Sequence, residues 1–255
     1  MWTRTAIACL VILLVAAPFA ARSGRALEPL DWPMWQRETV IVGERHGRPE
    51  STRLFLDLVK VAAERSPCPV VGLEIGMDQQ PALDALVRGE GTADAVRVPW
   101  VIAHPGYRDL LTELAHLAHG SCMEVLAIDS APDVAESRDA RMAARLAPYI
   151  GRRPVLVLVG RIHALRRIAW DAGAKAEQPL AERLAAQGGR DTVVSVLQDW
   201  PRPCDGPPTP RLVPVDSVQG AQAISTTFRV LSAAPPADPC DAADLVVVWE
   251  CEAPT

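Results

Sequence analysis

Aromatic residues and basic runs are scarce in this sequence of 255 residues. Phe, Trp and Tyr together make up 5%, with three Phe and two Tyr. Proteins that stack bases or sugars on their side chains usually carry more aromatic residues. The net charge is −5, and no Lys- and Arg-rich segment occurs. This composition argues against nucleic acid as a partner and favours a small-molecule or peptide ligand.

Several common catalytic motifs are absent. There is no G-x-G-x-x-G segment after an apolar run, so the sequence gives no support to a dinucleotide site. A Walker-type phosphate loop is also missing. No G-x-S-x-G nucleophile elbow is present, which argues against an ordinary serine α/β-hydrolase.

The most continuous apolar run lies at the N-terminus and predicts an export signal. Arg4 precedes an uncharged run over 6–17, and small residues follow over 20–26. This run is shorter than the roughly 20 residues that a membrane-spanning helix needs, so we expect a cleaved signal peptide over 1–26 rather than an anchor. The expected location is secreted or periplasmic, with no membrane span after signal removal.

Five cysteines remain after this signal is removed. In an oxidising compartment we expect disulfides with one cysteine left over. Cys68 and Cys122 each precede an apolar strand, so they can be bridged if those strands are parallel neighbours. The other pairings stay open, and no spacing is typical of a metal finger. These other cysteines are Cys204, Cys240 and Cys251.

Strands and helices alternate along most of the chain. Continuously apolar strands indicate a sheet covered on both faces, so the predicted fold is α/β with a mainly parallel sheet flanked by helices. We expect this domain over 27–200. The predicted strands are 39–42, 70–73, 125–128, 155–159 and 193–197, and the helices 49–65, 80–87, 107–119 and 135–147.

The sequence changes character after Trp200. Nine prolines fall between 201 and 239, and helical periodicity fades. We interpret 201–255 as a Pro- and Cys-containing C-terminal appendage tethered by disulfides, with a flexible tail as the alternative. The run 245–248 is expected as a last strand, antiparallel at an edge.

Polar side chains follow four of the predicted strands. Because ligands bind beyond the carboxyl ends of parallel strands, these side chains are expected to share one site. Glu44, His46, Glu74 and His163 could bind a divalent metal, or a carboxylate could orient His46 as a general base. Further candidates are His104 and Tyr107, which could close over the site, and Arg138, which could bind an anion or pair with a site carboxylate. The strand-end segments are 43–47, 73–74, 128–130 and 160–163.

These motifs together resemble the superfamily of erythromycin esterase-like, ChaN-like and TraB/Tiki proteins. The resemblance rests on Val42-Gly43-Glu44-Arg45-His46-Gly47, Gly72-Leu73-Glu74, Arg138-Asp139 with Met142-Ala143, and Gly160-Arg161-Ile162-His163-Ala164. It covers about 38–198 and implies that Glu44, His46, Glu74 and His163 line one cleft.

The resemblance leaves the activity divided among three kinds of protein. Esterase-like members are hydrolases in which the first-motif histidine activates water, Tiki-type members resemble metalloproteases, and ChaN-type members bind haem. The spacing of Glu44 and His46 resembles ChaN, whereas the Arg138-Asp139 run resembles the esterases. We favour a hydrolase of esterase or metalloprotease type. The alternative is a ChaN-like protein of haem or iron uptake, with Tyr107, His104 and Arg138 as candidate cofactor-binding residues.

Overall fold

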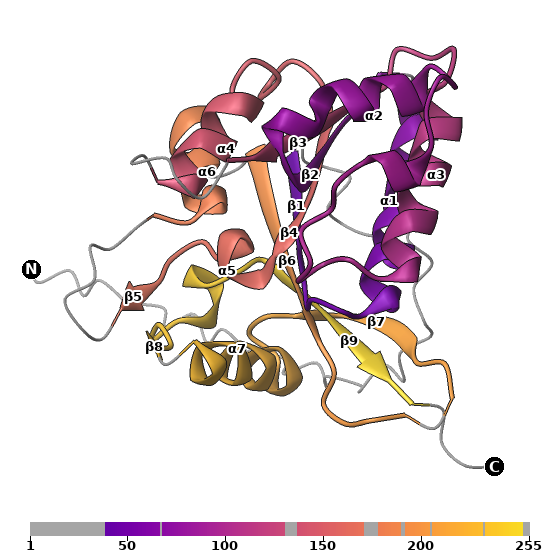
Figure 1. The fold of residues 1–255 in the computed structure, drawn as a ribbon. Helices are drawn as coiled ribbons and strands as arrows, with labels where there is room; N and C mark the ends of the chain where they lie inside the picture. Colours follow the sequence, from indigo (N-terminus) through magenta and orange to yellow (C-terminus); the bar gives the residue numbers. More distant parts are fainter. Residues whose placement is uncertain are drawn as a thin grey trace, which may run out of the picture.

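The computed structural model describes residues 39–251, apart from 67, 131–136, 171–177, 190–191, 205 and 232. The predicted signal peptide lies outside the described residues, as does the start of the helix predicted over 135–147. A seven-stranded sheet with strand order β3-β2-β4-β1-β6-β9-β7 forms the centre, and helices flank it (Figure 1). Its strands are β1 (Thr39–Glu44), β2 (Val70–Gly76), β3 (Glu124–Asp129), β4 (Val155–Gly160), β6 (Val193–Asp199), β7 (Thr209–Pro214) and β9 (Leu245–Glu250).

Six of the seven strands are parallel, which confirms the predicted fold class. The antiparallel exception is β7, which pairs with β9. A separate two-stranded sheet pairs β5 (Ala169–Trp170) with β8 (Ala233–Ala234). The helices are α1 (Pro49–Arg65), α2 (Gln80–Val87), α3 (Pro105–Ala118), α4 (Arg138–Leu146), α5 (Arg161–Ala164), α6 (Leu180–Gly188) and α7 (Val218–Val230).

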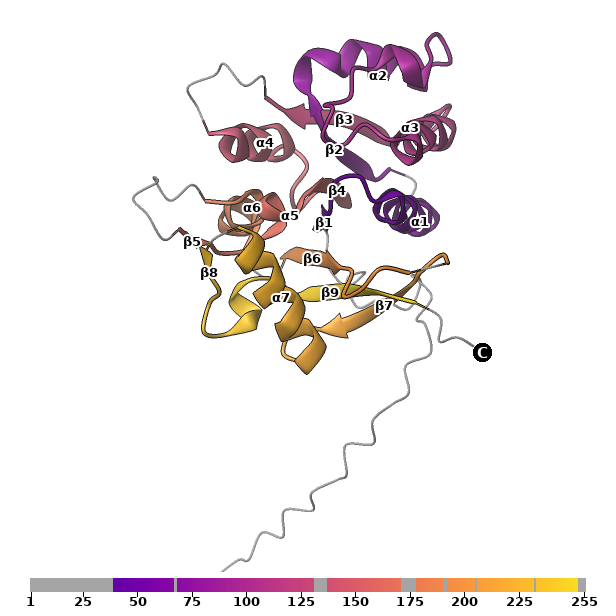
Figure 2. The same cartoon turned by 60° about the horizontal axis from the view of Figure 1, so that its bottom comes forward.

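Two apolar cores lie on the two faces of the sheet. Helices α1, α2 and α3 contribute to the first core, and α4, α6 and α7 to the second. Figure 2 shows these two groups of helices on opposite sides of the strands. The central strands β1 and β4 are buried along their whole length. Burial on both faces explains why their sequences are continuously apolar instead of alternating.

Helix α1 illustrates how the sequence sets the elements. It begins at Pro49, whose fixed φ suits the first helical position and whose missing N–H would have no partner there. Leu54, Phe55 and Leu58 recur at helical spacing and are at most 2% exposed. The observed bounds match the predicted ones.

The C-terminal segment completes the main sheet. Strand β9 is parallel to β6, from Val196↔Leu245 to Asp199↔Val248, and is antiparallel to β7. The strand expected at 245–248 is present, but it does not lie at the edge of the sheet as predicted. It lies between β6 and β7, and β7 forms the edge. Strand β7 was not predicted, because its two prolines and largely incomplete burial do not give a strand pattern.

Two disulfides tie distant segments together. Cys68–Cys122 joins the starts of the parallel neighbours β2 and β3, as predicted, with a Cα–Cα distance of 4.8 Å. Cys204–Cys251 links the segment after β6 to the end of β9. Cys240 is exposed and takes part in neither bridge. In the described part of the chain, no helix combines the length and apolar character needed to cross a membrane.

Candidate functional site

The site lies where the connections from two central strands diverge. Strand β1 continues into α1 on one face of the sheet, whereas neighbouring β4 continues through α5 towards α6 on the other face. A divergence of this kind opens a crevice at the carboxyl edge, where ligands bind in such sheets. The register pairs Glu44 of β1 with Gly160 of β4 at this edge.

Glu44 and His46 form a carboxylate–imidazole pair at the end of β1. Glu44 Oε1 lies 3.1 Å from His46 Nδ1. The glutamate side chain is 1% exposed, whereas the histidine is 39% exposed. The hydrogen bond to Glu44 raises the pKa of His46 above its usual value, because the carboxylate stabilises the imidazolium. Gly47, with φ +77°, then turns the chain towards α1.

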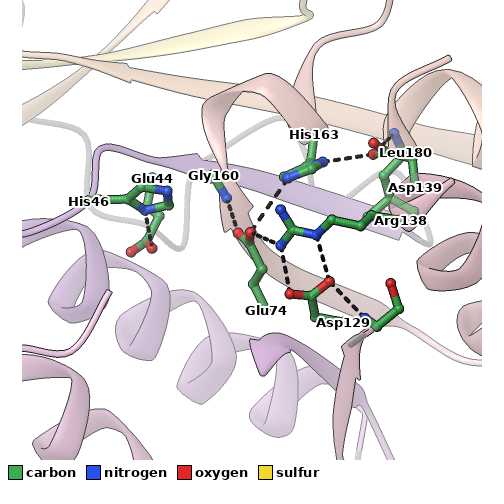
Figure 3. Close-up of polar contacts among 10 residues, drawn as sticks. Glu44, His46, Glu74, Asp129, Arg138, Asp139, Gly160, His163 and Leu180 are labelled. Carbon is green, nitrogen blue, oxygen red and sulfur yellow. Dashed lines mark hydrogen bonds and ion pairs between the residues drawn. The ribbon is translucent and has the colours of Figure 1, made fainter. Parts of the chain in front are cut away.

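Gly160 separates this pair from a second polar group (Figure 3). A Cβ on Gly160 would lie 3.0 Å from His46 Cε1 and 3.5 Å from Glu74 Oε2. The absence of a side chain therefore allows the imidazole to pack against the β4 backbone. The Gly160 N–H donates to Glu74 Oε2 at 2.6 Å, which joins β4 to the acid of β2.

Arg138, at the start of α4, joins two of the strand-end carboxylates. Its Nη2 donates to Glu74 Oε1 at 2.9 Å and to Asp129 Oδ2 at 2.6 Å. Its Nε donates to Asp129 Oδ1 at 2.9 Å, so the guanidinium binds Asp129 in a bidentate manner. The expected pairing of Arg138 with a site carboxylate is therefore present. Both carboxylates raise the pKa of Arg138, which stays charged.

His163 lies between two acids in the buried part of the site. Its Nδ1 donates to Asp139 Oδ1 at 2.8 Å, and its Nε2 lies 3.5 Å from Glu74 Oε1. Asp139 also accepts from the Leu180 N–H at 2.7 Å. Burial alone would lower the pKa of His163, but the two acids outweigh burial and raise it to about 9.

Glu74 is the corresponding anion. Burial alone would raise its pKa, but the hydrogen bond and charge of His163, the Gly160 N–H and Arg138 lower it to about 2. Glu74 is therefore a carboxylate and His163 an imidazolium at neutral pH. A protonated, buried imidazole cannot accept a proton, so the two histidines have different chemical properties.

Tyr107 and His104 pack together at the start of α3. Tyr107 is 1% exposed, and His104 packs edge-on against its ring at a centroid distance of 6.2 Å. Burial and the nearby charges of Glu44 and Glu74 raise the pKa of Tyr107 well above its usual value. The phenolate is the form that ligates ferric iron, so this environment does not fit the predicted haem ligand. In the described residues, the Tyr107 hydroxyl and Glu44 Oε2 are buried without a hydrogen-bond partner.

The predicted metal ligands do not form a single cluster. Within 39–251, excluding the gaps, no three His, Cys, Asp or Glu side chains are grouped to hold a metal ion. Both Glu74 oxygens accept hydrogen bonds, and one of them comes from the cationic Arg138. These side chains as they stand do not fit a cation, and the metal assignment stays a prediction.

Asp139 has a structural role that the sequence did not reveal. In the sequence it stands out only as part of the Arg138-Asp139 motif, yet it binds His163 and is 7% exposed. The only available signal was its place in that motif. His116 of α3 and His119, which follows α3, lie apart from the site and line a different depression with Val87 and Thr92.

Comparison with known proteins identifies the fold. No protein-family model matches the chain, and no curated protein matches it significantly. Among solved structures, ChaN of Campylobacter jejuni, described with cofacial haem binding, matches with a TM-score of 0.52 and 13% identity over 85% of this chain and 89% of that chain. The erythromycin esterase EreC in its open conformation matches with a TM-score of 0.55 and 10% identity. The match covers 83% of this chain and 90% of the EreC chain. A Bacillus cereus protein matches with a TM-score of 0.55 and 12% identity, over 84% of this chain and 88% of that chain.

These structures share the three-layer arrangement of this chain at 10–13% identity. The protein therefore has the same fold as ChaN and EreC, two kinds of protein that its motifs also resemble. One of these structures is an erythromycin esterase and another is described with haem binding, so the shared fold does not distinguish between the two activities.

Proposed function

We propose that the protein is a hydrolase of ester bonds in which His46 is the general base and Glu44 is its partner. The observation that carries this proposal is the asymmetric burial of the pair. A buried carboxylate holds Nδ1 of an imidazole whose ring is 39% exposed and can meet a ligand. This is the arrangement that general-base catalysis requires.

The chemistry follows from the two ring nitrogens. When Nδ1–H donates to Glu44, Nε2 is the free acceptor, and it removes a proton from water as the oxygen attacks the ester carbonyl. Glu44 stabilises the imidazolium that forms. The same proton then passes from His46 to the departing alkoxide, so the base is regenerated and the products are an acid and an alcohol.

The raised pKa of His46 predicts the pH dependence of this reaction. The base must be unprotonated, so kcat/KM should rise with pH through a pKa above 6.5. Replacing Glu44 with Gln removes the largest cause of the shift, so the midpoint should move to lower pH while kcat falls. A midpoint that does not move would contradict the Glu44–His46 assignment.

The buried network has a positioning role in this proposal. Glu74 holds the Gly160 N–H, and Arg138 and His163 hold Glu74 in turn. Gly160 is the backbone against which His46 packs. The network therefore fixes the surface that supports the base, without itself exchanging a proton with substrate.

The test is a screen of chromogenic carboxylic esters with the purified mature protein. We expect turnover that His46→Ala abolishes while the circular dichroism spectrum and Tm are retained. The matched control is His116→Ala, because His116 is an exposed histidine on α3 away from the site. Unchanged turnover in His46→Ala, or equal loss in the control, would refute the role of His46.

Haem binding is the second candidate function. It is favoured by the match to 89% of the Campylobacter jejuni ChaN chain and by the exposed imidazole of His46. A haemin titration should then give a saturable Soret band that is lost in His46→Ala. If the band persists in that variant, or no band forms, haem does not bind at this site.

We propose that the mature chain, 27–255, acts outside the cytoplasm. The two disulfides are compatible with an oxidising compartment, and the N-terminal segment has the pattern of an export signal. Fractionation of cells that express the full chain tests this. Recovery of the chain in the cytoplasm with reduced cysteines would contradict it.

A further inference from the structure

Two arginines follow the strand ends that carry the Glu44–His46 pair. The last register pair between β1 and β4 is Glu44↔Gly160, and the next residues are Arg45 and Arg161. The two backbones are close here, because a Cβ on Gly43 would lie 3.1 Å from Arg161 Cα. Both arginines therefore lie at the same edge of the sheet as His46.

Neither arginine is neutralised by a direct ion pair within the described residues. Arg45 is exposed, and Arg161 is half-buried. The hydrogen bond recorded for the Arg161 guanidinium is a long one, from Nη1 to Thr227 Oγ1 at 3.5 Å. Burial lowers the pKa of Arg161, and the charge of Arg45 lowers it further. Two cations thus repel each other at a partly desolvated position.

One acid lies close to these arginines. Asp199 ends β6, the other neighbour of β1, and is 7% exposed. Burial raises the pKa of Asp199, while Arg161 and Arg45 act in the opposite direction. With Asp199 ionised, Arg45, Arg161 and Asp199 together carry a net charge of +1, while the Glu44 carboxylate at this edge is engaged by His46 Nδ1.

Two other arginines near the sheet are already engaged by carboxylates, and Arg48 lies over the Trp200 ring. Arg138 binds Asp129 and Glu74, and Arg166 donates to the Val193 carbonyl and binds Asp244. Arg45 and Arg161 differ from Arg138 and Arg166 because neither forms a direct ion pair within the described residues, and Asp199 acts on them only through its charge. A ligand that supplies the missing negative charge would stabilise them most.

We propose that Arg45 and Arg161 form an anion subsite beside His46 that selects esters carrying a negatively charged group near the scissile bond. This inference names the substrate class of the hydrolase proposed above and rests on that function. Guanidinium groups bind carboxylate and phosphate oxygens in the same way, so the shared chemistry is a small oxyanion.

The kinetic test compares two esters that differ in one charge. The monoester of p-nitrophenol with glutaric acid carries a carboxylate, and p-nitrophenyl valerate has an apolar chain of similar length. We expect kcat/KM to be higher for the charged ester than for the apolar one. Arg161→Met should reduce this ratio about tenfold, because one hydrogen bond to a charged group contributes about that much to binding. The matched control is Arg152→Met, which removes an exposed arginine just before β4, at the opposite end of that strand from Arg161. It should keep the preference for the charged ester.

A binding test does not depend on turnover. Titration calorimetry with inorganic phosphate and, separately, with glutarate measures the affinity of the subsite directly. We expect Arg161→Met to weaken binding about tenfold and Asp199→Asn to strengthen it, because Asp199 repels the anion. Arg152→Met should bind as the wild type does. The probe that binds with the higher affinity shows whether the subsite prefers phosphate or carboxylate.

The outcomes separate the two proposals. If both esters are hydrolysed equally and neither anion binds, the subsite is refuted while the hydrolase proposal stands. If no ester is hydrolysed but anions bind in an Arg161-dependent manner, the hydrolase proposal fails and the subsite is retained. Binding that is unchanged in Arg161→Met, or lost equally in Arg152→Met, would overturn the inference.

Discussion

The buried imidazolium of His163 makes a testable contribution to stability. In the folded chain its pKa is about 9, against 6.5 for an unperturbed histidine. The folded state therefore holds a proton that the unfolded state releases between these two pH values. The resulting stability is fully present below pH 6.5 and is lost as the pH rises through about 9. The replacement His163→Gln removes this titration.

The magnitude follows from the size of the shift. One pKa unit corresponds to about 1.4 kcal/mol, so a shift from 6.5 to about 9 gives on the order of 3 kcal/mol. His163 is 8% exposed, so solvent screens this interaction little. At its steepest, the free energy of unfolding should fall by about 1.4 kcal/mol per pH unit.

Urea denaturation of the mature, disulfide-bonded protein at pH 6.0, 7.5 and 9.0 measures this slope. We expect a decline between the first and last pH in the wild type and a flatter profile in His163→Gln, which is less stable at pH 6.0. Proton NMR of the imidazole Cε1–H should give a titration near pH 9 that is absent in the variant. An identical slope in both proteins would refute the reasoning.

Three further predictions concern the site and its support. Gly160→Ala should keep the fold but lower kcat/KM at least tenfold in the ester assay. The new Cβ would lie only 3.0 Å from His46 Cε1, so the His46 ring would have to move. Arg138→Met should lower the free energy of unfolding by about 2 kcal/mol in urea at pH 7, since it removes the cation shared by two carboxylates that are at most 9% exposed. The double replacement of Cys68 and Cys122 by Ser should lower that free energy by about 4 kcal/mol, as expected for a bridge with a sequence separation of 54.

The parallel core was predictable because its strands are continuously apolar. The predicted runs 39–42 and 155–159 became β1 and β4, each extended by one or two residues to the site glycine or glutamate. The end residues were missed because Gly43-Glu44 and Gly160 do not resemble a strand by composition. They belong to it because pairing continues to Glu44↔Gly160.

The C-terminal part was harder to predict because pairing between distant segments defines it. Strand β7 contains Pro210 and Pro214, which a central strand would exclude, and it is tolerated at the edge where one row of donors needs no partner. The parallel pairing of β9 with β6 was equally hidden, because four apolar residues fit either direction.

The sequence predicted which candidate residues lie at one edge of the sheet, but it did not predict the surroundings of each. Glu44, Glu74 and His163 were expected there because the topology brings the carboxyl ends of parallel strands to one edge. The difference between the histidines depends on burial and on Asp139, which reaches His163 from a helix start. No local pattern encodes that contact.

The two carboxylate–imidazole pairs have the same chemistry but opposite exposure. His163 is enclosed by Asp139 and Glu74 with a pKa of about 9, so it keeps its proton at neutral pH and acts as a fixed cation. His46 has one carboxylate and a ring that is 39% exposed, so it can exchange its proton with a ligand. Because Gly160 lies next to both groups, the buried group around Glu74 and His163 holds the backbone against which the Glu44–His46 pair packs. Loss of His163 should therefore lower kcat through the position of His46, without shifting the pH midpoint as far as loss of Glu44 does.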